Sequence, residues 1–321
     1  MRGALRLYFG KVTIEGLERV PVDKPILVTP NHQNAFLDAF LVGAFAPIDL
    51  HFLTRSDVFK WWSKPLLRMV NMMPIYRIRD GFSKLSLNDA VFETCKNLFA
   101  EGKSVLVFPE GNHGEHYYLR PLTKGAARIA LLSQTQIDQK LMIQPVGLNY
   151  FHHQKARTPV TVVFGDPIPV SDFVQAFDQN PAKGLISLRE RMTEGMKQTL
   201  VIPEKTDDYD QRKRFVFQEA HHDLSFEALK TLDSRGIGPE PQTKKRWLAC
   251  LVNPLPFIVI KKVISRVDDI VFHSSLKFSI GLFAFPLWWG LVFLVLSLTV
   301  GTPIALLAVV VMVSGLFYGY Q

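Results

Sequence analysis

The chain has 321 residues with 48% hydrophobic and 21% charged side chains and a net charge of +8, a length that accommodates one large domain with an appendage. Its two cysteines, Cys95 and Cys250, exclude a disulfide framework and suit a reducing compartment. No recognition motif or aromatic-basic repeat accompanies the positive charge, so we expect no nucleic-acid partner.

The first predicted strands lead to a histidine. Alternating apolar residues predict a strand within residues 8–20, and the apolar run 25–29 predicts a buried strand. A Pro-Asn turn signal follows this run, and residues 36–45 predict a helix. His32 therefore lies at the carboxyl end of a strand, where α/β sheets commonly hold catalytic groups.

His32 and Asp38 are a candidate acid–base pair. A histidine removes a proton from a hydroxyl near neutral pH, and a nearby carboxylate fixes its tautomer. Residues six apart on a regular helix point about 120° away from each other. His32 must therefore lie in the turn, with the helix starting near Asn34 as its N-cap. Helix capping alone is the alternative interpretation of Asp38.

The next elements carry basic side chains. Residues 51–54 predict a buried strand, and residues 56–70 predict an apolar helix that packs in the core or leans on a membrane surface. A short strand over residues 73–81 ends in Arg77 and Arg79, whose spacing places both side chains on one face. Such a pair matches phosphate oxygens, although solvated surface arginines have the same spacing.

A second strand ends in polar residues. Residues 88–100 predict a helix that Gly102 terminates, and residues 104–108 predict a buried parallel strand. Glu110 and Gly111 follow this strand in a Pro-Glu-Gly turn. Because an unpaired buried carboxylate is costly, we expect Glu110 to meet a donor or a cation.

The remaining elements complete an α/β pattern. Lys124 opens a helix, and residues 142–148, which include Pro145, and 159–164 predict two further strands. Alternating strands and helices predict a mixed, largely parallel sheet flanked by helices. Residues 171–277 are more polar and predict a helical extension that ends in a basic segment.

The end of the chain carries no charge. All 37 Lys and Arg and all 29 Asp and Glu precede Phe278. Residues 278–300 and 304–320 are apolar, and each stretch is near the roughly 20 residues that a bilayer core requires. A basic segment precedes them, with no acid among its residues until Asp268: Lys244, Lys245, Arg246, Lys261, Lys262 and Arg266.

Positive charge beside an apolar segment attracts anionic lipid and marks the cytoplasmic side. We therefore expect a C-terminal transmembrane helical hairpin and an active site that faces the cytoplasm. A buried hairpin in a soluble protein is the alternative. These patterns divide the chain into an α/β core at 1–170, a helical extension with a basic juxtamembrane segment at 171–277, and a membrane hairpin at 278–321.

Four blocks of residues resemble the motifs of the glycerolipid acyltransferase family, membrane-associated enzymes that acylate glycerol 3-phosphate and its lysophosphatidate product. In family order, the resembling blocks are Asn31-His32 through Asp38, Pro74-Ile75-Tyr76-Arg77, Phe108-Pro109-Glu110-Gly111 and Ile143-Gln144-Pro145-Val146. The resemblance covers roughly residues 8–170. It implies that His32 is the general base and Asp38 its orienting partner.

The expected substrate-binding residues lie in or beside these blocks: Arg77, Arg79, Glu110, Gly111, Lys124 and Pro145. Two departures from the family pattern stand out. Five residues instead of four separate His32 from Asp38, and Asn112-His113-Gly114 stands where many relatives carry Thr-Arg-Ser. Both departures resemble the glycerol-3-phosphate and dihydroxyacetone-phosphate branch. Without the arginine that many relatives carry there, other cations in this region would have to bind the phosphate: Arg77, Arg79, Arg120 and Lys124.

We therefore expect an O-acyltransferase of phospholipid biosynthesis. It would move an acyl group from acyl-CoA or acyl-carrier protein directly to glycerol 3-phosphate or dihydroxyacetone phosphate, without a cofactor, a metal or a covalent acyl-enzyme. Its partners would be membrane lipids, the acyl donor and the phosphorylated glycerol acceptor.

Other functions remain open. A lysophosphatidate acyltransferase is the first alternative, and a non-catalytic membrane lipid-binding protein is the second. A metallohydrolase would use His113, Glu115, His116, His152 and His153, but no recognised metal-ligand spacing supports it. Cys95 lies in a predicted helix without a nearby histidine, so we expect an inert buried thiol.

Overall fold

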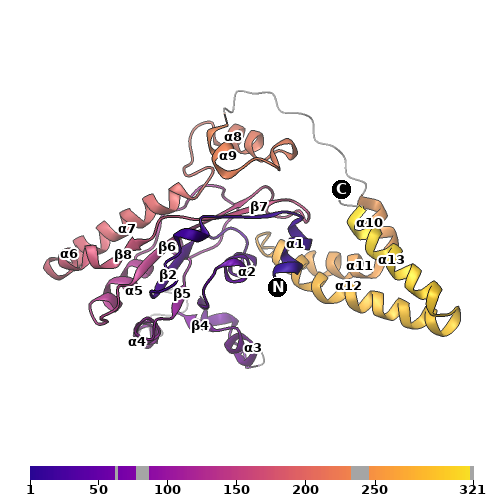
Figure 1. The fold of residues 1–321 in the computed structure, drawn as a ribbon, viewed down its shortest axis with the longest axis horizontal. Coiled ribbons are helices and arrows are strands. Elements are labelled where there is room, and N and C mark those ends of the chain that lie inside the picture. The colour runs from indigo at the N-terminus through magenta and orange to yellow at the C-terminus, as the bar shows by residue number, and fades with distance from the viewer. Residues whose placement is uncertain (62–63, 77–86, 233–245, 319–321) are drawn as a thin grey trace.

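The structure is a computed structural model that describes residues 1–61, 64–76, 87–232 and 246–318 (Figure 1). Eight strands form one sheet in the order β1-β7-β6-β2-β5-β3-β4, and β8 pairs with β6. The strands are β1 Val12–Glu15, β2 Ile26–Pro30, β3 Leu50–Arg55, β4 Met72–Ile75, β5 Ser104–Leu106, β6 Met142–Tyr150, β7 Val160–Phe164 and β8 Ile168–Pro169.

The sheet is largely parallel. Strand β2 pairs in parallel with β5 and β6, β3 pairs in parallel with β5 and β4, and β1 pairs in parallel with β7. The antiparallel partners of β6 are β7 and β8. The prediction of a mixed, largely parallel α/β sheet flanked by helices is therefore confirmed.

Helices surround the sheet and continue beyond it. Their bounds are α1 Arg2–Phe9, α2 Phe36–Phe45, α3 Lys64–Met69, α4 Leu87–Ala100, α5 Gly125–Gln134, α6 Val174–Gln179, α7 Pro181–Gln198, α8 Tyr209–Val216, α9 Phe226–Thr231, α10 Arg246–Val252, α11 Pro254–Ile264, α12 Phe272–Thr299 and α13 Thr302–Tyr318.

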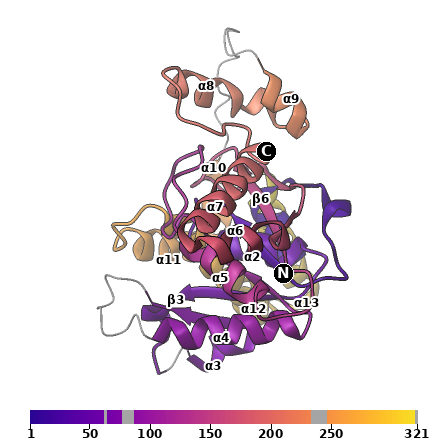
Figure 2. The same cartoon turned by 90° about the vertical axis from the view of Figure 1, so that its left-hand side faces the viewer.

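The two faces of the sheet bury different sets of helices. Leu27 of β2 joins a core with α4, α5 and α7, whereas Ile26 and Val28 join a core with α1, α2 and the start of α12. This division follows from the alternation of side chains along a strand. In Figure 2, α5, α6 and α7 lie in front of the sheet.

Two predicted elements are shorter than expected. Residues 8–20 begin inside α1, turn at Gly10 with a positive φ of 75°, and contribute only four residues to β1. Residues 56–70 contain a 3-10 turn at Ser56–Val58 and then α3, in which Pro65 occupies the first turn. Proline suits that position because its fixed φ matches a helix and its missing N–H has no partner there.

The region predicted as a helical extension packs in two places. Helix α7 buries Leu188, Met192 and Met196 in the core of the sheet. Helices α8 and α9 form a separate cluster with Phe151 and Val163. The division at residues 170 and 277 stays a prediction, and α12 begins at Phe272, inside the predicted extension.

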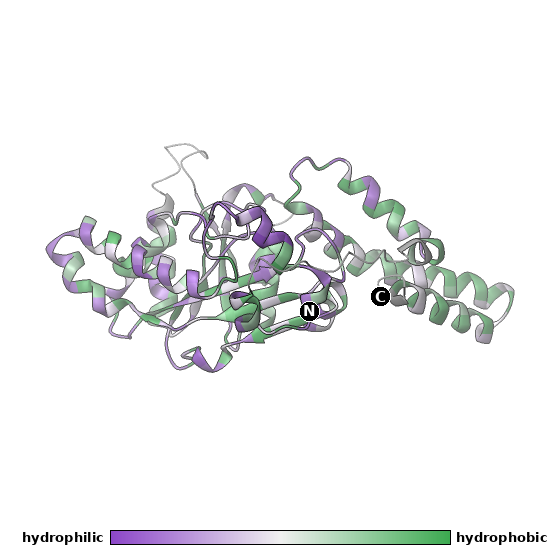
Figure 3. Ribbon diagram, turned by 90° about the horizontal axis from the view of Figure 1, so that it is seen from above, coloured by the Kyte–Doolittle hydropathy of each residue, from purple (hydrophilic) through white to green (hydrophobic). Residues whose placement is uncertain are grey.

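The C-terminal helices project from the α/β core, and hydrophobic residues cover much of them (Figures 1 and 3). Within the described part of the chain, one helix, α12, is long and apolar enough to cross a membrane. Helix α13 packs against it and is shorter. The prediction that the two helices span a membrane as a hairpin stays a prediction.

Candidate active site

The turn after β2 is attached to the neighbouring strand β6. The Asn31 side chain donates to the Leu148 carbonyl at 3.2 Å and accepts from the Leu148 amide at 2.7 Å. These two bonds continue the pairing of β2 with β6 beyond the end of the strand. They fix the backbone from which His32 projects.

Asp38 collects the donors of this turn. Its Oδ2 lies 2.8 Å from His32 Nδ1 and accepts from the amides of Gln33 at 2.8 Å and Asn34 at 2.7 Å. Its Oδ1 accepts from the Tyr150 hydroxyl at 2.5 Å. All four contacts suit an ionised carboxylate, which only accepts hydrogen bonds. His32 then carries its proton on Nδ1, and Nε2 has a lone pair that can take a proton.

His32 lies in the turn as predicted, but the prediction that Asn34 caps the helix is wrong. Helix α2 starts at Phe36, and its N-cap Ala35 has a positive φ of 46°. The Asn34 side chain instead donates to the His153 carbonyl at 3.0 Å. A hydroxyl from α12 replaces it: Ser275 Oγ accepts from the Leu37 amide at 3.1 Å and donates to the Asn34 carbonyl at 2.8 Å.

Aromatic rings enclose the imidazole of His32. The Phe108 ring stacks on it with centroids 3.8 Å apart and planes inclined by 14°. The His113 ring meets it edge-on at 5.6 Å. The His32 side chain remains 15% exposed, so it is open to solvent on one side.

Glu110 lies under the same turn. Its Oε1 accepts from the His32 amide at 3.3 Å, and its Oε2 lies 2.5 Å from the Arg120 guanidinium. Burial raises the pKa of Glu110 to about 7, against the lowering effect of Arg120 and of the His32 amide. Gly111 has a positive φ of 76°, and a Cβ there would lie 3.0 Å from Thr123. This tight packing holds the Pro-Glu-Gly turn against the start of α5.

Arg120 ties the two turns together. Its guanidinium donates to the carbonyls of His32 at 3.3 Å and His113 at 3.4 Å, and also to the carbonyl of Asn112. With the Glu110 ion pair, these contacts occupy much of its fork of donors. Arg120 therefore braces the turns in this structure.

His113 and His153 are both poor proton acceptors here. Burial lowers the pKa of His113, and His32 lowers it further when the His32 ring is protonated. Burial lowers the pKa of His153 to about 3. The His153 ring donates from Nε2 to Gln33 Oε1 at 2.9 Å, so this neutral histidine supports the His32 turn from behind.

The structure brings together His32, Asp38, Glu110 and Gly111 among the residues expected from the sequence. Lys124 directly precedes α5 and its side chain is exposed. Arg77 and Arg79 lie outside the described residues.

Pro145 lies inside β6 opposite Thr29 of β2. It packs against Gly165 and against Gly195 of α7. Pro145 therefore contributes to the core of the sheet in this structure. Its expected role beside the acyl thioester stays a prediction.

Sequence reasoning missed several groups that support the turn: Gln33, Tyr150, His153 and Ser275. Each lies far along the chain from its partner or outside a resembling block. For Tyr150 the sequence offered one local signal: it lies at the polar end of β6, an otherwise apolar strand.

The other candidate nucleophile and metal ligands do not assemble. In the described ranges, no three His, Cys, Asp or Glu side chains gather in a group able to bind a metal ion. His116 stacks on Tyr118 instead. Burial raises the pKa of Cys95 to about 12, so its thiol is not activated as a nucleophile.

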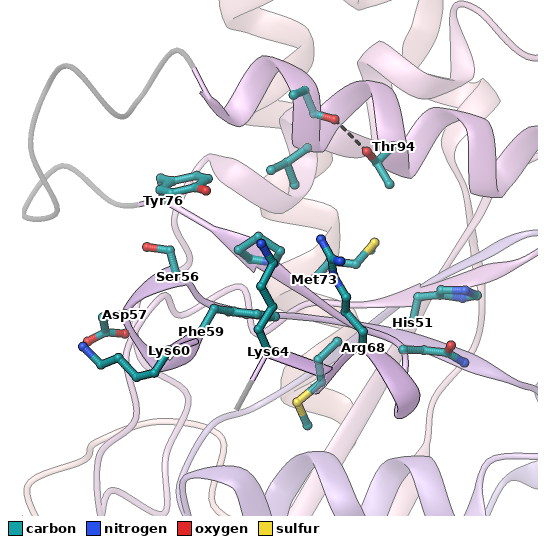
Figure 4. Close-up of a pocket in the computed structure, with 15 residues that line it drawn as sticks. His51, Ser56, Asp57, Phe59, Lys60, Lys64, Arg68, Met73, Tyr76 and Thr94 are labelled. Carbon is teal, nitrogen blue, oxygen red and sulfur yellow. Dashed lines mark hydrogen bonds between the residues drawn. The ribbon is translucent and has the colours of Figure 1, made fainter. Parts of the chain in front are cut away.

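A pocket of about 910 Å³ lies beside β3 and β4 (Figure 4). It extends from His51 near the start of β3 to Tyr76 just after β4. Lys64 and Arg68 of α3 point across the strands toward α4. They are four residues apart, so one face of the helix presents both cations.

Comparisons with known proteins give one family. Residues 11–149 match the model of the family described as Acyltransferase. Glycerol-3-phosphate O-acyltransferase 1 of Saccharomyces cerevisiae is 31% identical over 35% of this chain and 15% of the relative. The 1-acyl-sn-glycerol-3-phosphate acyltransferase BAT2, chloroplastic, of Brassica napus is 31% identical over 38% of this chain and 34% of the relative.

The matches thus span well under half the length of these two curated relatives. Among solved structures, the 1-acyl-sn-glycerophosphate (LPA) acyltransferase PlsC of Thermotoga maritima is similar, with 23% identity and a TM-score of 0.44. That similarity covers 62% of this chain and 74% of the other.

Proposed function

We propose that this chain, whose residues 11–149 match the Acyltransferase family model, transfers a fatty acyl group from a thioester to the hydroxyl of a glycerol phosphate. The observation that carries the proposal is the bond between His32 Nδ1 and the buried Asp38, which leaves Nε2 available at the carboxyl end of β2.

The reaction needs one proton shuttle. His32 Nε2 takes the proton of the acceptor hydroxyl as its oxygen attacks the thioester carbonyl. The C–S bond then breaks, and the imidazolium returns the proton to the departing thiolate. Asp38 stabilises the imidazolium through Nδ1, in the same way as the carboxylate of a Ser-His-Asp triad. No covalent acyl-enzyme forms.

We propose glycerol 3-phosphate or dihydroxyacetone phosphate as the acceptor. The residues after the Pro-Glu-Gly turn, Asn112-His113-Gly114, resemble that branch of the family. Lysophosphatidate is the alternative acceptor, and relatives named for both reactions match this chain with about equal identity. A non-catalytic lipid-binding protein is the second alternative.

The acyl donor has a candidate site in the pocket beside β3 and β4. CoA and the prosthetic group of an acyl-carrier protein both carry phosphate, and phosphate binds to cations such as Lys64 and Arg68. Strand β4 is three strands away from β2 in the sheet, about 14 Å at the usual spacing. An extended pantetheine arm spans such a distance.

We further propose that the protein acts at a membrane with its active site on the cytoplasmic side. Helix α12 and the basic residues before it support this location. A membrane-bound enzyme can take a soluble phosphorylated acceptor from water and release an amphiphilic product into the bilayer.

The test is an assay of the purified protein with glycerol 3-phosphate, dihydroxyacetone phosphate and lysophosphatidate in parallel, each with CoA and carrier-protein thioesters. We expect acylation of a glycerol phosphate, and a loss of about 10²- to 10⁴-fold in kcat for His32→Ala. His116→Ala is the control, because His116 is an exposed histidine that stacks on Tyr118. Full activity in His32→Ala, or an acyl group trapped on Ser or Cys, contradicts the proposal.

A further inference from the structure

A second pocket, of about 580 Å³, lies between α12, α11, α1 and the loop that joins β6 to β7. One face of α12 forms its longest wall, with Lys277, Phe278, Gly281, Leu282, Phe285 and Trp289. Lys277, Gly281, Phe285 and Trp289 recur every four positions, and Phe278 and Leu282 lie beside this row, which places all six on one face of the helix. From the first to the last, the row is about 18 Å long at the usual helical rise.

The walls of this pocket are apolar beyond its entrance. Phe257 and Ile260 of α11 face the row on α12, and Leu7 of α1 closes another side. The centre stays open because Gly281 has no side chain, and a Cβ there would meet nothing closer than the Phe285 ring at 3.5 Å. We call the apolar part of this pocket, which follows the row on α12, the slot.

Positive charge gathers at one end of the slot. Lys155 and Arg157 come from the loop between β6 and β7, and Lys277 comes from α12. No Asp or Glu is among the described residues that line the pocket. Lys277 and Arg157 each donate to a backbone carbonyl, those of Gln154 and Leu7, so both cations are held at the rim.

The charge pattern of the chain indicates how a ligand would lie. Lys277 is the last charged residue, and every residue of α12 after it is uncharged. The cationic rim is therefore at the level where α12 would leave the aqueous phase, and the slot extends toward the membrane interior. A ligand with one anionic end and one straight apolar chain matches this arrangement.

We propose that this pocket binds one anionic phospholipid of the surrounding bilayer. Its phosphate contacts Lys155, Arg157 and Lys277, and one acyl chain lies in the slot between Gly281 and Trp289. A free phosphate ion would leave the slot empty, and a lipid without net negative charge would not balance the positive charge at the rim. The site depends on the membrane location of α12 and does not depend on acyl transfer.

Such a lipid would hold α12 against the loop that supports the active site. Residues 151–157 contribute both to the pocket and to the His32 turn, since His153 contacts Gln33 and Asn34. Ser274 of α12 donates to the His153 carbonyl from the same side. The bound lipid thus joins the apolar helix and the catalytic turn into one unit.

The charge of the site is tested by lipid retention of the full chain in native mass spectrometry. The purified protein in detergent receives equal amounts of phosphatidylglycerol and phosphatidylcholine with the same acyl chains. We expect one phosphatidylglycerol to be retained in preference, and Lys155→Glu to lower its retention about tenfold, which is the worth of one charge-assisted contact. Lys140→Glu is the control, because Lys140 is also exposed and lies in a different loop.

The slot is tested with the same substitution at two glycines of α12. Gly281→Leu fills the slot and should lower retention about tenfold or more, since it removes the space for an acyl chain. Gly290→Leu is the control, because a Cβ at Gly290 meets nothing within 4 Å. Equal retention of the two lipids, or unchanged retention in both Lys155→Glu and Gly281→Leu, overturns the proposal. If the wild-type protein showed no acyl transfer, lipid retention could still be measured. That result would contradict only the proposed function.

Discussion

At the residue scale, the position of His32 depends on its partner Asp38 and on the groups that hydrogen-bond to Asp38. Asp38 is fully buried, and Tyr150 donates to the oxygen that His32 does not use. Burial raises the pKa of the Tyr150 phenol well above its ordinary value, so this hydroxyl keeps its proton and stays a donor. Tyr150 therefore acts as a positioning residue for the His32–Asp38 pair.

Tyr150→Phe tests this role. We expect kcat to fall about tenfold, because Asp38 loses one of its four donors, while KM changes little since Tyr150 is buried away from substrate. Steady-state kinetics with the best acceptor measures the split. Tyr118→Phe removes a phenol from a half-buried tyrosine that stacks on His116 and serves as the control. A rise in KM at constant kcat would assign Tyr150 to substrate binding.

His153 gives the fold a sensitivity to acid. Its pKa is about 3 in the folded protein, whereas a histidine in an unfolded chain titrates near 6.5. Between these values the unfolded chain binds a proton that the folded chain does not bind, so stability falls as the pH falls below about 6.5. The loss between pH 6.5 and pH 5 is about 2 kcal/mol.

We therefore expect the wild-type Tm to decline more steeply than that of His153→Gln between pH 7.5 and pH 5. Glu110 has the opposite sign: its pKa of about 7 makes the folded state bind the extra proton, so stability rises as the pH falls from about 7 toward 4.5. The wild type and His153→Gln both contain Glu110, so the effect of Glu110 on stability cancels in the comparison. Parallel Tm profiles of the two proteins would show that His153 takes up a proton in the folded state as readily as in the unfolded chain.

At the scale of elements, α12 completes the N-terminus of α2. The first amides of a helix need acceptors from outside it, and α2 receives one from Ser275, which is fully buried. Ser275 also donates to the Asn34 carbonyl, next to the amide that contacts Asp38. The His32 turn is thus attached to the apolar helix by a hydroxyl.

Ser275→Ala should lower the free energy of unfolding by about 1 kcal/mol, the usual cost of losing a helix cap. It should also lower kcat, because the turn between His32 and Asp38 loses one support. Ser275→Thr retains the hydroxyl and should restore kcat. Ser297→Ala is the control, since Ser297 lies in the same helix and donates to the Phe293 carbonyl within that helix. A loss of stability without a change in kcat would make Ser275 purely structural.

Helix α3 carries the prediction for the acyl donor. If Lys64 and Arg68 bind donor phosphate, Lys64→Ala and Arg68→Ala should each raise KM for the thioester about tenfold and leave KM for the glycerol phosphate unchanged. Lys96→Ala is the control, because Lys96 pairs with Glu93 on α4. A change in the acceptor KM instead would relocate the glycerol phosphate to this pocket.

At the scale of the whole molecule, α12 has two parts with different surroundings. Its first residues are part of the α/β core: Ser274, Ser275 and Phe278 are buried, and Phe278 packs against Tyr8 and Phe40. Beyond Gly281 many apolar side chains are exposed, including Phe283 and Leu287. An exposed apolar surface of this kind marks contact with a membrane or a partner.

Two truncations test these two parts separately. A chain that ends at Ile280 should fold and retain the His32 turn but fail to sediment with membranes. A chain that ends at Val271 should lose both membrane binding and stability, because α2 loses its cap and the core loses Phe278. Sedimentation with vesicles and thermal unfolding measure the two effects. Unchanged sedimentation of the longer truncated chain would assign membrane binding to α10, α11 or the α3 region.

The sequence by itself determined many of the strands and helices and the two turns that carry His32 and Glu110. Apolar periodicity and turn signals are local, and they located β2, β5, β6 and α4 and set His32 and Glu110 at the ends of strands. The prediction from sequence was wrong where a local rule competed with a contact from a distant part of the chain. Asn34 satisfies the rule for an N-cap, yet Ser275 supplies the hydroxyl and Asn34 turns to His153.

Only the tertiary structure decided what surrounds the imidazole. Tyr150 lies 112 residues from Asp38 in the chain, and Ser275 lies 241 residues from Asn34. The sheet order brings the first pair together, and the return of α12 to the core brings the second. Hydrogen bonds and packing depend on distance in space, which no local pattern of residues records, so these contacts follow from the fold alone.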